Sequence, residues 1–213
     1  MTRLVLIRHG QTEWNKSGKY QGQSDVALSE EGLAQARCLA EHFPIEKLDA
    51  IYASDLSRAM VTAEIVAERF GLEVRPEPAF RELSFGDWEG LTYAQIVAGW
   101  PEAMANFLTH PDIMVIPGGE TFPQVQARAM KRLRKIVAKH EPHDQTVGIF
   151  AHGAVLRTML AGILQMPLSM VWSLSQYNTA VNLARFDEGR PTVELLNSTA
   201  HLALAGLSGQ GRI

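Results

Sequence analysis

Short, continuous apolar runs alternate along the chain with longer segments in which apolar residues recur every three or four positions. The continuous runs are typical of strands buried on both faces, and the periodic segments are typical of amphipathic helices. Ser29 and Ser57 are the expected N-caps of two helices, and Gly71 is expected to end the second of them. The predicted strands are Leu4–Ile7, Asp49–Ser54, Leu72–Val74, Thr146–Ala151, Asn178–Asp187 and Thr192–Leu196, and the predicted helices are Glu30–Phe43, Arg58–Phe70, Thr92–Gly99, Glu102–Leu108, Thr121–His140 and Gly153–Leu164.

The alternation of strands and helices predicts an α/β fold. Connections of this kind give a mostly parallel central sheet with helices on both faces, which is a three-layer sandwich. The last two strands are joined by Glu188-Gly189-Arg190, and this short link predicts a hairpin. Residues 81–123 are less regular and are interrupted by proline and glycine. We interpret them as an insertion or cap segment within a single domain that spans residues 1–213.

Size and composition fit one soluble globular domain. The chain has 213 residues, of which 46% are apolar and 20% are charged. A domain of this size buries roughly 70% of its unfolded surface, so it needs neither a disulfide nor a metal in order to fold. The net charge is -3 and the lysines and arginines form no long run, which argues against a nucleic-acid or anionic-membrane partner.

Cysteine content and the N-terminal sequence restrict the setting further. Cys38 is the single cysteine, so the sequence offers no internal disulfide and no cysteine pair for zinc. The N-terminal Met-Thr-Arg leads directly into a predicted strand, with no charged region followed by a long apolar stretch. We find neither a signal peptide nor a transmembrane segment, and a cytoplasmic location is the default expectation.

Polar residues follow several apolar segments at positions where a binding crevice is expected. In an open α/β sheet the ligand binds beyond the carboxyl ends of the strands. Histidine, arginine or glutamate occurs at such strand ends in four places: Arg8-His9-Gly10, Ser54–Arg58, Arg81-Glu82 after Pro78–Phe80, and His152-Gly153. Because buried charge is costly unless it is paired, their coincidence predicts a shared cleft rather than core packing.

Arginines and histidines together in one cleft suit a dianion such as phosphate. The arginine guanidinium presents a planar fork that matches phosphate oxygens, and a histidine nitrogen can attack phosphorus. Arg8 would hold the phosphoryl oxygens beside His9, and Gly10 would permit a tight turn. A metal site is the rival use of His9 and His152. No carboxylate or cysteine lies at ligand spacing from either histidine, however, and the adjacent arginine would repel a cation.

Leu4–Asn15, with the sequence LVLIRHGQTEWN, resembles the signature of the histidine phosphatase superfamily, the phosphoglycerate mutase-like proteins. The resemblance covers nearly the whole chain. Further matching segments are YQGQSDVALSEEG at Tyr20–Gly32, ASDLSRAMVTA at Ala53–Ala63, RELSFGDWEG at Arg81–Gly90, PGGET at Pro117–Thr121 and AHGAVLR at Ala151–Arg157. The resemblance implies the phosphoglycerate mutase-like fold and a phosphomonoesterase of the histidine acid phosphatase type.

The same resemblance implies roles for individual residues. His9 would be the nucleophile that becomes phosphohistidine, and Glu82 would protonate the leaving alkoxide and then activate water. The other catalytic positions implied are Arg8, Arg58 and His152, and the substrate-binding positions implied are Asn15, Gln21, Gly22 and Gly153. The family reaction needs no metal and no cofactor. We therefore expect a small-molecule phosphomonoester as the binding partner.

This chemistry places requirements on its two central residues. The nucleophilic nitrogen of His9 must be unprotonated, so its other ring nitrogen should donate to a fixed acceptor. Glu82 must carry a proton in the first step, which calls for a less polar setting. The apolar neighbours that would supply this setting, unless they are plain packing residues, are Phe80, Leu83, Phe85 and Trp88.

The alternative within the family is cofactor-dependent phosphoglycerate mutase, which needs extra cations for a highly anionic substrate. No lysine or arginine occurs between Arg81 and Arg128, so this segment offers no clamp for a second anionic group. The sequence FGDWEG also resembles the phosphatase branch, and we favour water as the final acceptor. Aromatic residues of the same segment are expected either at the rim of the cleft or in the core, and they are Phe85, Trp88, Tyr93, Trp100 and Phe107.

The sequence leaves the substrate and the assembly open. Phosphoserine, sugar phosphates, alpha-ribazole phosphate and other small phosphomonoesters all suit the motifs. The chain could be a monomer or a homodimer. A non-catalytic phospholigand-binding protein on the same fold is the alternative from another functional class, although every core catalytic position is present.

Overall fold

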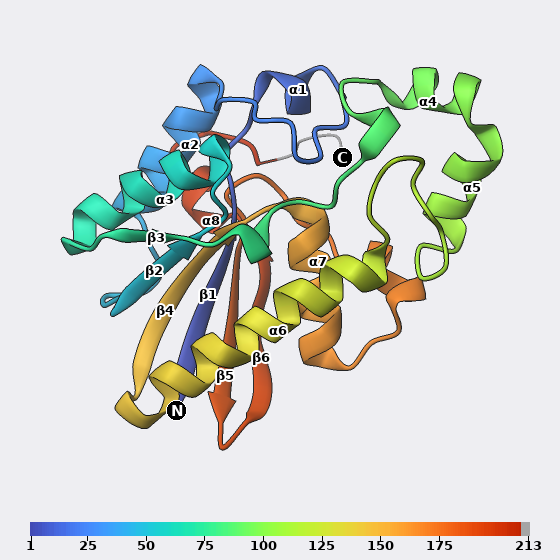
Figure 1. Ribbon diagram of the computed structural model, residues 1–213. Coiled ribbons are helices and arrows are strands. Elements are labelled where there is room, and N and C mark those ends of the chain that lie inside the picture. The colour runs from blue at the N-terminus through green and yellow to red at the C-terminus, as the bar shows by residue number, and fades with distance from the viewer. Residues whose placement is uncertain (210–213) are drawn as a thin grey trace.

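The computed structural model describes residues 1–209, and a six-stranded sheet lies at its centre (Figure 1). The strands are β1 (Thr2–Arg8), β2 (Ala50–Ala53), β3 (Val74–Pro76), β4 (Gln145–Ala151), β5 (Val181–Asp187) and β6 (Arg190–Ser198). Their spatial order is β3-β2-β4-β1-β5-β6. Neighbouring strands from β3 to β1 are parallel, whereas β5 is antiparallel to both β1 and β6. The sheet is therefore mostly parallel, as the order of elements predicts.

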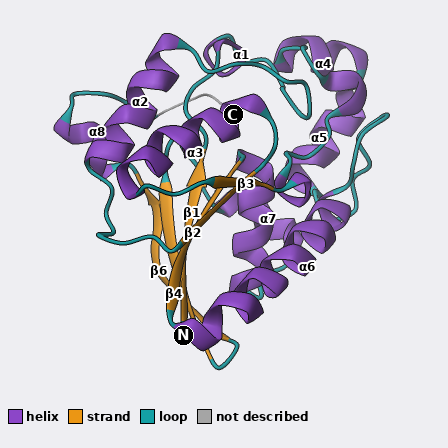
Figure 2. Ribbon diagram, turned by 60° about the vertical axis from the view of Figure 1, so that its left-hand side comes forward, coloured by secondary structure: helices purple, strands orange, loops and turns teal. Residues whose placement is uncertain are grey.

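Helices cover both faces of this sheet, which gives the predicted three-layer sandwich (Figure 2). The helices are α1 (Glu13–Lys16), α2 (Glu30–Glu41), α3 (Ser57–Phe70), α4 (Tyr93–Gly99), α5 (Pro101–Thr109), α6 (Phe122–His140), α7 (Gly153–Leu164) and α8 (Ala200–Leu204). Val5 and Ile7 of β1 are buried against α2 and α3, and Leu4 and Leu6 belong to the core on the side of α6 and α7. None of the helices described is long and apolar enough to cross a bilayer.

The predicted elements are confirmed in order and type, but several boundaries differ. β3 begins at Val74 rather than Leu72. Pro78–Phe80 forms one turn of 3₁₀ helix, so the loop that carries the predicted acid does not follow a strand. Ser57 is the first residue of α3 and not its side-chain cap, because its hydroxyl donates to Asp25 instead. The short helices α1 and α8 were not predicted, since four or five residues are too few to show an apolar period.

Residues 81–123 carry α4 and α5 and lie at one end of the molecule (Figure 1). Phe107 of α5 is fully buried and packs edge-on against Trp88 and Trp172. Trp88 and Phe107 belong to the same buried cluster as the facing sides of α6 and α7, and the partly buried Trp172 packs against it. The single domain with an inserted cap segment stays a prediction, and this shared core supports it.

The turn after β1 depends on Gly10 and Gly32, and each of them packs against the backbone of the segment that contains the other. A Cβ on Gly10 would meet the carbonyl of Gly32 in the first turn of α2, and a Cβ on Gly32 would overlap the carbonyl of Gln11. The N–H of Gly10 also donates to the hydroxyl of Thr62 on α3, at 3.1 Å. Glycine is therefore needed for close approach of two backbones, which holds the turn between α2 and α3.

Gly32→Ala is expected to lower the free energy of unfolding by about 1–3 kcal/mol, because the new methyl group would be driven into the backbone of Gln11. Gly99→Ala is the matched control, since no atom lies near a Cβ at the end of α4. That control should keep the free energy of unfolding or raise it by up to about 1 kcal/mol, because alanine has less freedom than glycine in the unfolded chain. Urea unfolding measures both values, and equal stability of the two variants would contradict this account of the turn.

Candidate active site

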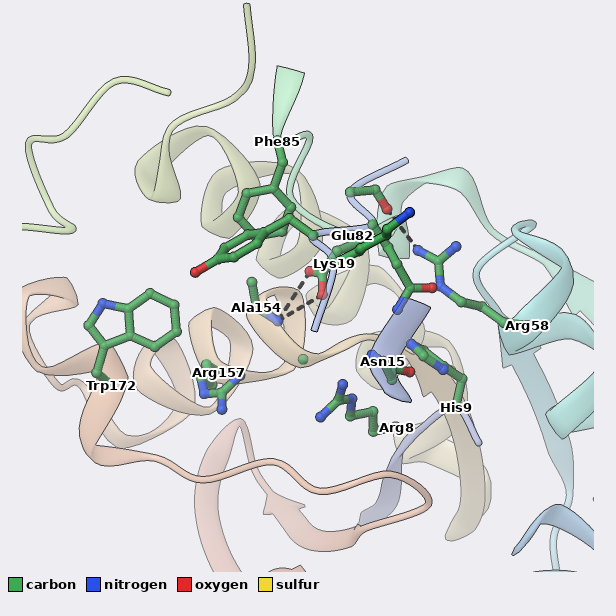
Figure 3. A pocket seen from close by; sticks show the side chains of 14 residues that line it. Arg8, His9, Asn15, Lys19, Arg58, Glu82, Phe85, Ala154, Arg157 and Trp172 are labelled. Carbon is green, nitrogen blue, oxygen red and sulfur yellow. Dashed lines mark hydrogen bonds between the residues drawn. The ribbon is translucent and has the colours of Figure 1, made fainter. Parts of the chain in front are cut away.

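A cavity opens at the carboxyl end of β1, beside the start of α7 (Figure 3). Its empty volume, counted with the space open to solvent, is about 510 Å³. All the predicted site residues line it except His152, whose ring centroid lies 5.1 Å from that of His9. Arg81 lies outside the cavity and forms an ion pair with Asp55 at 2.5 Å. No cluster of three or more side chains suited to a metal ion occurs within residues 1–209.

His9 directly follows β1 and is held by backbone contacts on two sides. Its N–H donates to the carbonyl of Ala151 at 3.0 Å, and its own carbonyl accepts from the N–H of Thr179 at 3.2 Å. The ring Nδ1 lies 2.6 Å from the carbonyl oxygen of Gly10. Because a carbonyl can only accept, Nδ1 carries the ring proton and Nε2 keeps its lone pair. This is the fixed acceptor that the sequence analysis required.

Burial and nearby arginines keep both histidines neutral. Burial, followed by the charges of Arg58 and Arg8, holds the pKa of His9 well below its usual range. Burial and then Arg58 lower the pKa of His152 in the same way. Nδ1 of His152 accepts from Nε of Arg58 at 3.2 Å, so its ring proton is on Nε2. That buried N–H has no partner among the described residues, and an oxygen of a bound phosphate would satisfy it.

Arg58 is a fully buried cation whose other hydrogen bonds go to backbone carbonyls. It donates to Ser24 at 2.8 Å and to Gly22 at 2.7 Å. Arg8 donates from Nη1 to the carbonyl of Gln176 at 2.6 Å, and its Nε has no partner within residues 1–209. Burial lowers the pKa of each arginine to about 10, which leaves both cationic at neutral pH. Two buried cations held mainly by neutral groups prepare the cavity for an anion.

Neutral amide donors stand beside these cations. Asn15 belongs to the capping box of α1, and its Oδ1 accepts from the backbone N–H of Thr12 at 3.1 Å and from Asn178 at 3.4 Å. Oε1 of Gln21 accepts from the hydroxyl of Thr12 at 2.9 Å. With both oxygens engaged, the side-chain nitrogens of Asn15 and Gln21 are left to donate to a ligand. Gly22 has a φ of +54°, the left-handed conformation that favours glycine.

The carboxylate of Glu82 lies in a polar setting, and the less polar one expected from the sequence is wrong. It accepts backbone hydrogen bonds from Leu83 at 2.9 Å, Ala154 at 3.0 Å and Val155 at 3.0 Å (Figure 3 shows the one from Ala154). Ala154 and Val155 are in the first turn of α7, where free N–H groups and the helix dipole favour negative charge. Of the apolar neighbours only Phe85 lines the cavity. The others are fully buried in the core, and they are Phe80, Leu83 and Trp88.

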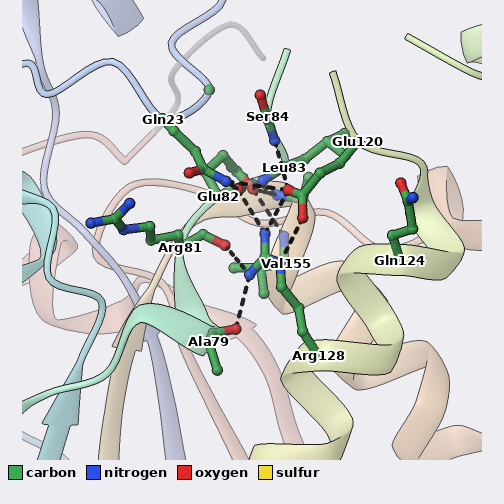
Figure 4. A network of polar contacts seen from close by, with 12 residues as sticks. Gln23, Ala79, Arg81, Glu82, Leu83, Ser84, Glu120, Gln124, Arg128 and Val155 are labelled. Atoms are coloured by element: carbon green, nitrogen blue, oxygen red, sulfur yellow. Dashed lines mark hydrogen bonds and ion pairs between the residues drawn. The ribbon is translucent and has the colours of Figure 1, made fainter. Parts of the chain in front are cut away.

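A hydrogen-bond network behind Glu82 fixes the backbone of its loop (Figure 4). Arg128 of α6 donates two hydrogen bonds of 2.9 Å to the carboxylate of Glu120. The same guanidinium donates to the carbonyls of Ala79, Arg81 and Glu82 at 2.8–2.9 Å. Glu120 belongs to the PGGET motif, for which the sequence suggested no role. Its part here is to hold the arginine that positions the acid loop.

Arg157 and Lys19 also line the cavity, and neither of these cations was among the candidate residues predicted from the sequence. Arg157 lies four residues after Gly153 on α7, so that both share one face of the helix. Lys19 comes from the segment between α1 and α2. The lack of a clamp for a second anion therefore holds for the segment between Arg81 and Arg128 but not for the cavity, because other segments supply the cations.

The aromatic walls of the cavity also differ in part from the expectation. Phe85 lines the cavity, and the ring of Tyr20 packs edge-on against the ring of Phe85, with ring centroids 5.0 Å apart. Trp172, which carries no sequence signal, lines the cavity from a 3₁₀ helix at Leu168–Ser173. The remaining aromatic candidates do not line it, and they are Trp88 and Phe107 in the core and Tyr93 and Trp100 elsewhere.

Comparison with known proteins finds relatives over almost the full chain. The family model of the histidine phosphatase superfamily (branch 1) matches residues 4–199. Phosphoserine phosphatase 1 of Hydrogenobacter thermophilus is 35% identical over 202 residues, which cover 95% of this chain and 95% of that protein.

Solved structures agree with this result. Bacillus stearothermophilus YhfR superposes with a TM-score of 0.89 and 36% identity, covering 94% of this chain and 99% of that one. The phosphoserine phosphatase of Entamoeba histolytica gives a TM-score of 0.84 and 32% identity, with 95% and 100% of the two chains covered. That protein has been solved in complex with phosphoserine, as a mutant, and in complex with 3-phosphoglyceric acid.

The neutral state of His9 and His152 predicts that the fold loses stability in mild acid. The folded state keeps both imidazoles unprotonated because their pKa values are lowered, whereas the unfolded chain protonates them below about pH 6.5. The unfolded state then binds more protons, so the free energy of unfolding falls as the pH falls from about 7 to about 5. Melting temperatures in phosphate-free buffers measure this decline.

His9→Gln should flatten the decline, because it removes one of the histidines that cause it, whereas His152 and His201, whose pKa burial lowers to about 4, still contribute. His143→Gln is the control for the substitution itself, since His143 is exposed and lies outside the cavity. The same slope in all three proteins would contradict the assignment of a neutral, buried His9.

Proposed function

The chain belongs to the histidine phosphatase superfamily, and from that premise we propose that it hydrolyses phosphomonoesters of small metabolites through a phosphohistidine on His9. The observation that carries the proposal is the geometry of this residue. Its Nδ1–H is fixed on the carbonyl of Gly10, so Nε2 keeps a lone pair in a cavity that buried arginines line. A neutral, oriented imidazole beside cations that attract phosphate is what attack on phosphorus needs.

In the first step Nε2 of His9 attacks phosphorus and the ester P–O bond breaks. Arg8, Arg58 and the free N–H of His152 hold the phosphoryl oxygens and offset their charge in the transition state. Glu82 gives a proton to the leaving alkoxide oxygen. The N–H groups of α7 stabilise the carboxylate that results.

In the second step water attacks the phosphorus of the phosphohistidine and the P–N bond breaks. The electron pair of that bond returns to Nε2 of His9. The Glu82 carboxylate accepts a proton from the attacking water, which restores the carboxylic acid for the next substrate. The side-chain nitrogens of Asn15 and Gln21 donate to the phosphoryl group throughout. Inorganic phosphate leaves, and no redox partner enters the cycle.

Two alternatives differ in the fate of the phosphoryl group. A mutase would return it from the histidine to a second hydroxyl, and a phospholigand-binding protein would hold the ester unchanged. The relative from Hydrogenobacter, a phosphoserine phosphatase similar over the full length, supports transfer to water. The oriented lone pair on His9 supports catalysis over binding alone.

Assays of the wild type and of His9→Ala test the proposal. The wild type should release p-nitrophenol from p-nitrophenyl phosphate without added metal, and EDTA should leave the rate unchanged because neither step uses a metal. His9→Ala should lower the rate by a factor of roughly 10³ or more, since no other group replaces the nucleophile. Rapid quenching in base with radiolabelled substrate should trap phosphate on the wild type but not on the variant.

No hydrolysis by the wild type at any pH from about 5 to about 8 would overturn the proposal. Conversion of 3-phosphoglycerate to 2-phosphoglycerate, faster than its hydrolysis, would favour the mutase instead.

Glu82→Gln tests the proton transfer separately. With an alkyl phosphate the variant should lose a factor of roughly 10²–10⁴ in kcat, because the alkoxide must leave unprotonated. With p-nitrophenyl phosphate it should still give a rapid burst of nitrophenol, since nitrophenolate leaves without a proton, followed by slow turnover. Inhibition by inorganic phosphate should change much less than kcat.

Glu73→Gln is the control for this change, because Glu73 is exposed and lies outside the cavity. It should behave as the wild type does. A loss of phosphate affinity by Glu82→Gln as large as its loss of turnover would contradict the assignment, and so would the absence of the burst.

A further inference from the structure

Arg157 is a cation of the cavity that neither step of the hydrolysis uses. An ideal Cβ at Gly153 would lie 3.1 Å from Nη1 of Arg157 and 3.7 Å from Nε of Arg8. The two guanidiniums therefore lie on either side of a residue that has no side chain to separate them. In Figure 3 Arg157 lies between Arg8 and Trp172, on the side of the cavity away from His9.

The guanidinium of Arg157 is held in place but is not neutralised. Its Nε donates to the carbonyl of Leu174 at 2.7 Å, and its Cζ lies 5.4 Å from the ring centroid of Trp172. Among the described residues nothing accepts a hydrogen bond from its Nη1 or Nη2, and no carboxylate forms an ion pair with it. Burial lowers its pKa, and Glu82 is the carboxylate that opposes this effect. A largely buried cation with a free fork calls for an anionic ligand.

The balance of charge in the cavity calls for more than one anionic group. Four cationic side chains line it against one carboxylate, and they are Arg8, Lys19, Arg58 and Arg157 against Glu82. A phosphate dianion leaves an excess of at least one positive charge. The free Nη1 and Nη2 groups of Arg157 and the one remaining positive charge match a single carboxylate. A carboxylate accepts two parallel hydrogen bonds from an arginine.

We propose that Arg157 binds a carboxylate on the leaving group, so that the preferred substrates are phosphomonoesters of small hydroxy acids, including hydroxy amino acids. The phosphoryl group lies at His9 and the carboxylate at Arg157, with Arg8 between them. The inference rests on the proposed function, because it takes the phosphoryl group to lie at His9. Phosphoserine and 3-phosphoglyceric acid, with which the Entamoeba relative was solved, both carry such a carboxylate.

Matched pairs of substrates isolate the effect of the carboxylate. O-phosphoserine differs from O-phosphoethanolamine only by this group, and 3-phosphoglycerate differs from glycerol 3-phosphate by a carboxylate in place of a hydroxymethyl group. In the wild type, kcat/KM should be roughly ten to a hundred times higher for the carboxylate member of each pair.

Variants of Arg157 then assign the preference to this residue. Arg157→Gln should remove most of the difference in kcat/KM between the two members of each pair. Arg157→Lys should keep part of this difference, because lysine retains the charge but not the planar guanidinium. Arg134→Gln is the control, since it makes the same change on α6 outside the cavity, and it should leave the ratio unchanged. Melting temperatures of all variants show whether they fold.

The outcomes separate this inference from the hydrolase itself. If the wild type hydrolyses p-nitrophenyl phosphate but treats both members of each pair alike, the carboxylate site is overturned and the hydrolase stands. The same holds if Arg157→Gln lowers kcat/KM by the same factor for both members of a pair. It also holds if Arg157 is instead responsible for a preference for bisphosphates over the carboxylate esters. Failure to hydrolyse any phosphomonoester overturns the proposed function. The comparison of pairs in the wild type needs no variant, so poor folding of Arg157→Gln does not prevent a decision.

Discussion

The arrangement of the site, and of the segments around it, follows from positive charge buried at the ends of the central strands. Arg58 is fully buried and Arg8 is 5% exposed, and within residues 1–209 their hydrogen bonds go to carbonyls and to a histidine rather than to carboxylates. Removing a cation from water costs on the order of several kcal/mol unless it is compensated. Carbonyl groups compensate part of that cost. The charge that is not compensated attracts an anion. Burial, and then this charge, keep His9 neutral, so one costly arrangement would supply both the proposed phosphate site and the proposed nucleophile.

Backbone contacts, more than ion pairs between side chains, hold this arrangement in place. The turn after β1 is set by the approach of Gly10 to Gly32, and it leaves the Gly10 carbonyl where the ring of His9 can donate to it. The loop with the acid is tied by Arg128 to α6, while its carboxylate takes the free N–H groups of α7. Such rigid supports keep the groups oriented before substrate arrives, which lowers the reorganisation needed in the transition state.

The outcome for Glu82 shows how local sequence can mislead about a site. The residue stands between Phe80 and Phe85 in the chain, and this apolar context predicts an apolar setting. In the fold the neighbouring apolar side chains are buried in the core, whereas the carboxylate reaches the start of a helix more than 70 residues away in sequence. Hydrogen-bond partners at that separation leave no trace in a local pattern. The polar setting still suits the proposed mechanism, in which Glu82 is a carboxylate for part of each cycle.

The order of strands and helices, the sheet class and the small set of residues that could handle phosphate can all be read from the amino-acid sequence. It could do so because apolar periodicity reports burial, and because Arg8-His9-Gly10 and His152-Gly153 lie at strand ends that a parallel sheet must bring to one edge. The surroundings of these residues follow from the folded chain alone. Arg157 and Trp172 join the cavity because the paths of α7 and the following 3₁₀ helix converge on it, and such convergence depends on packing between distant segments.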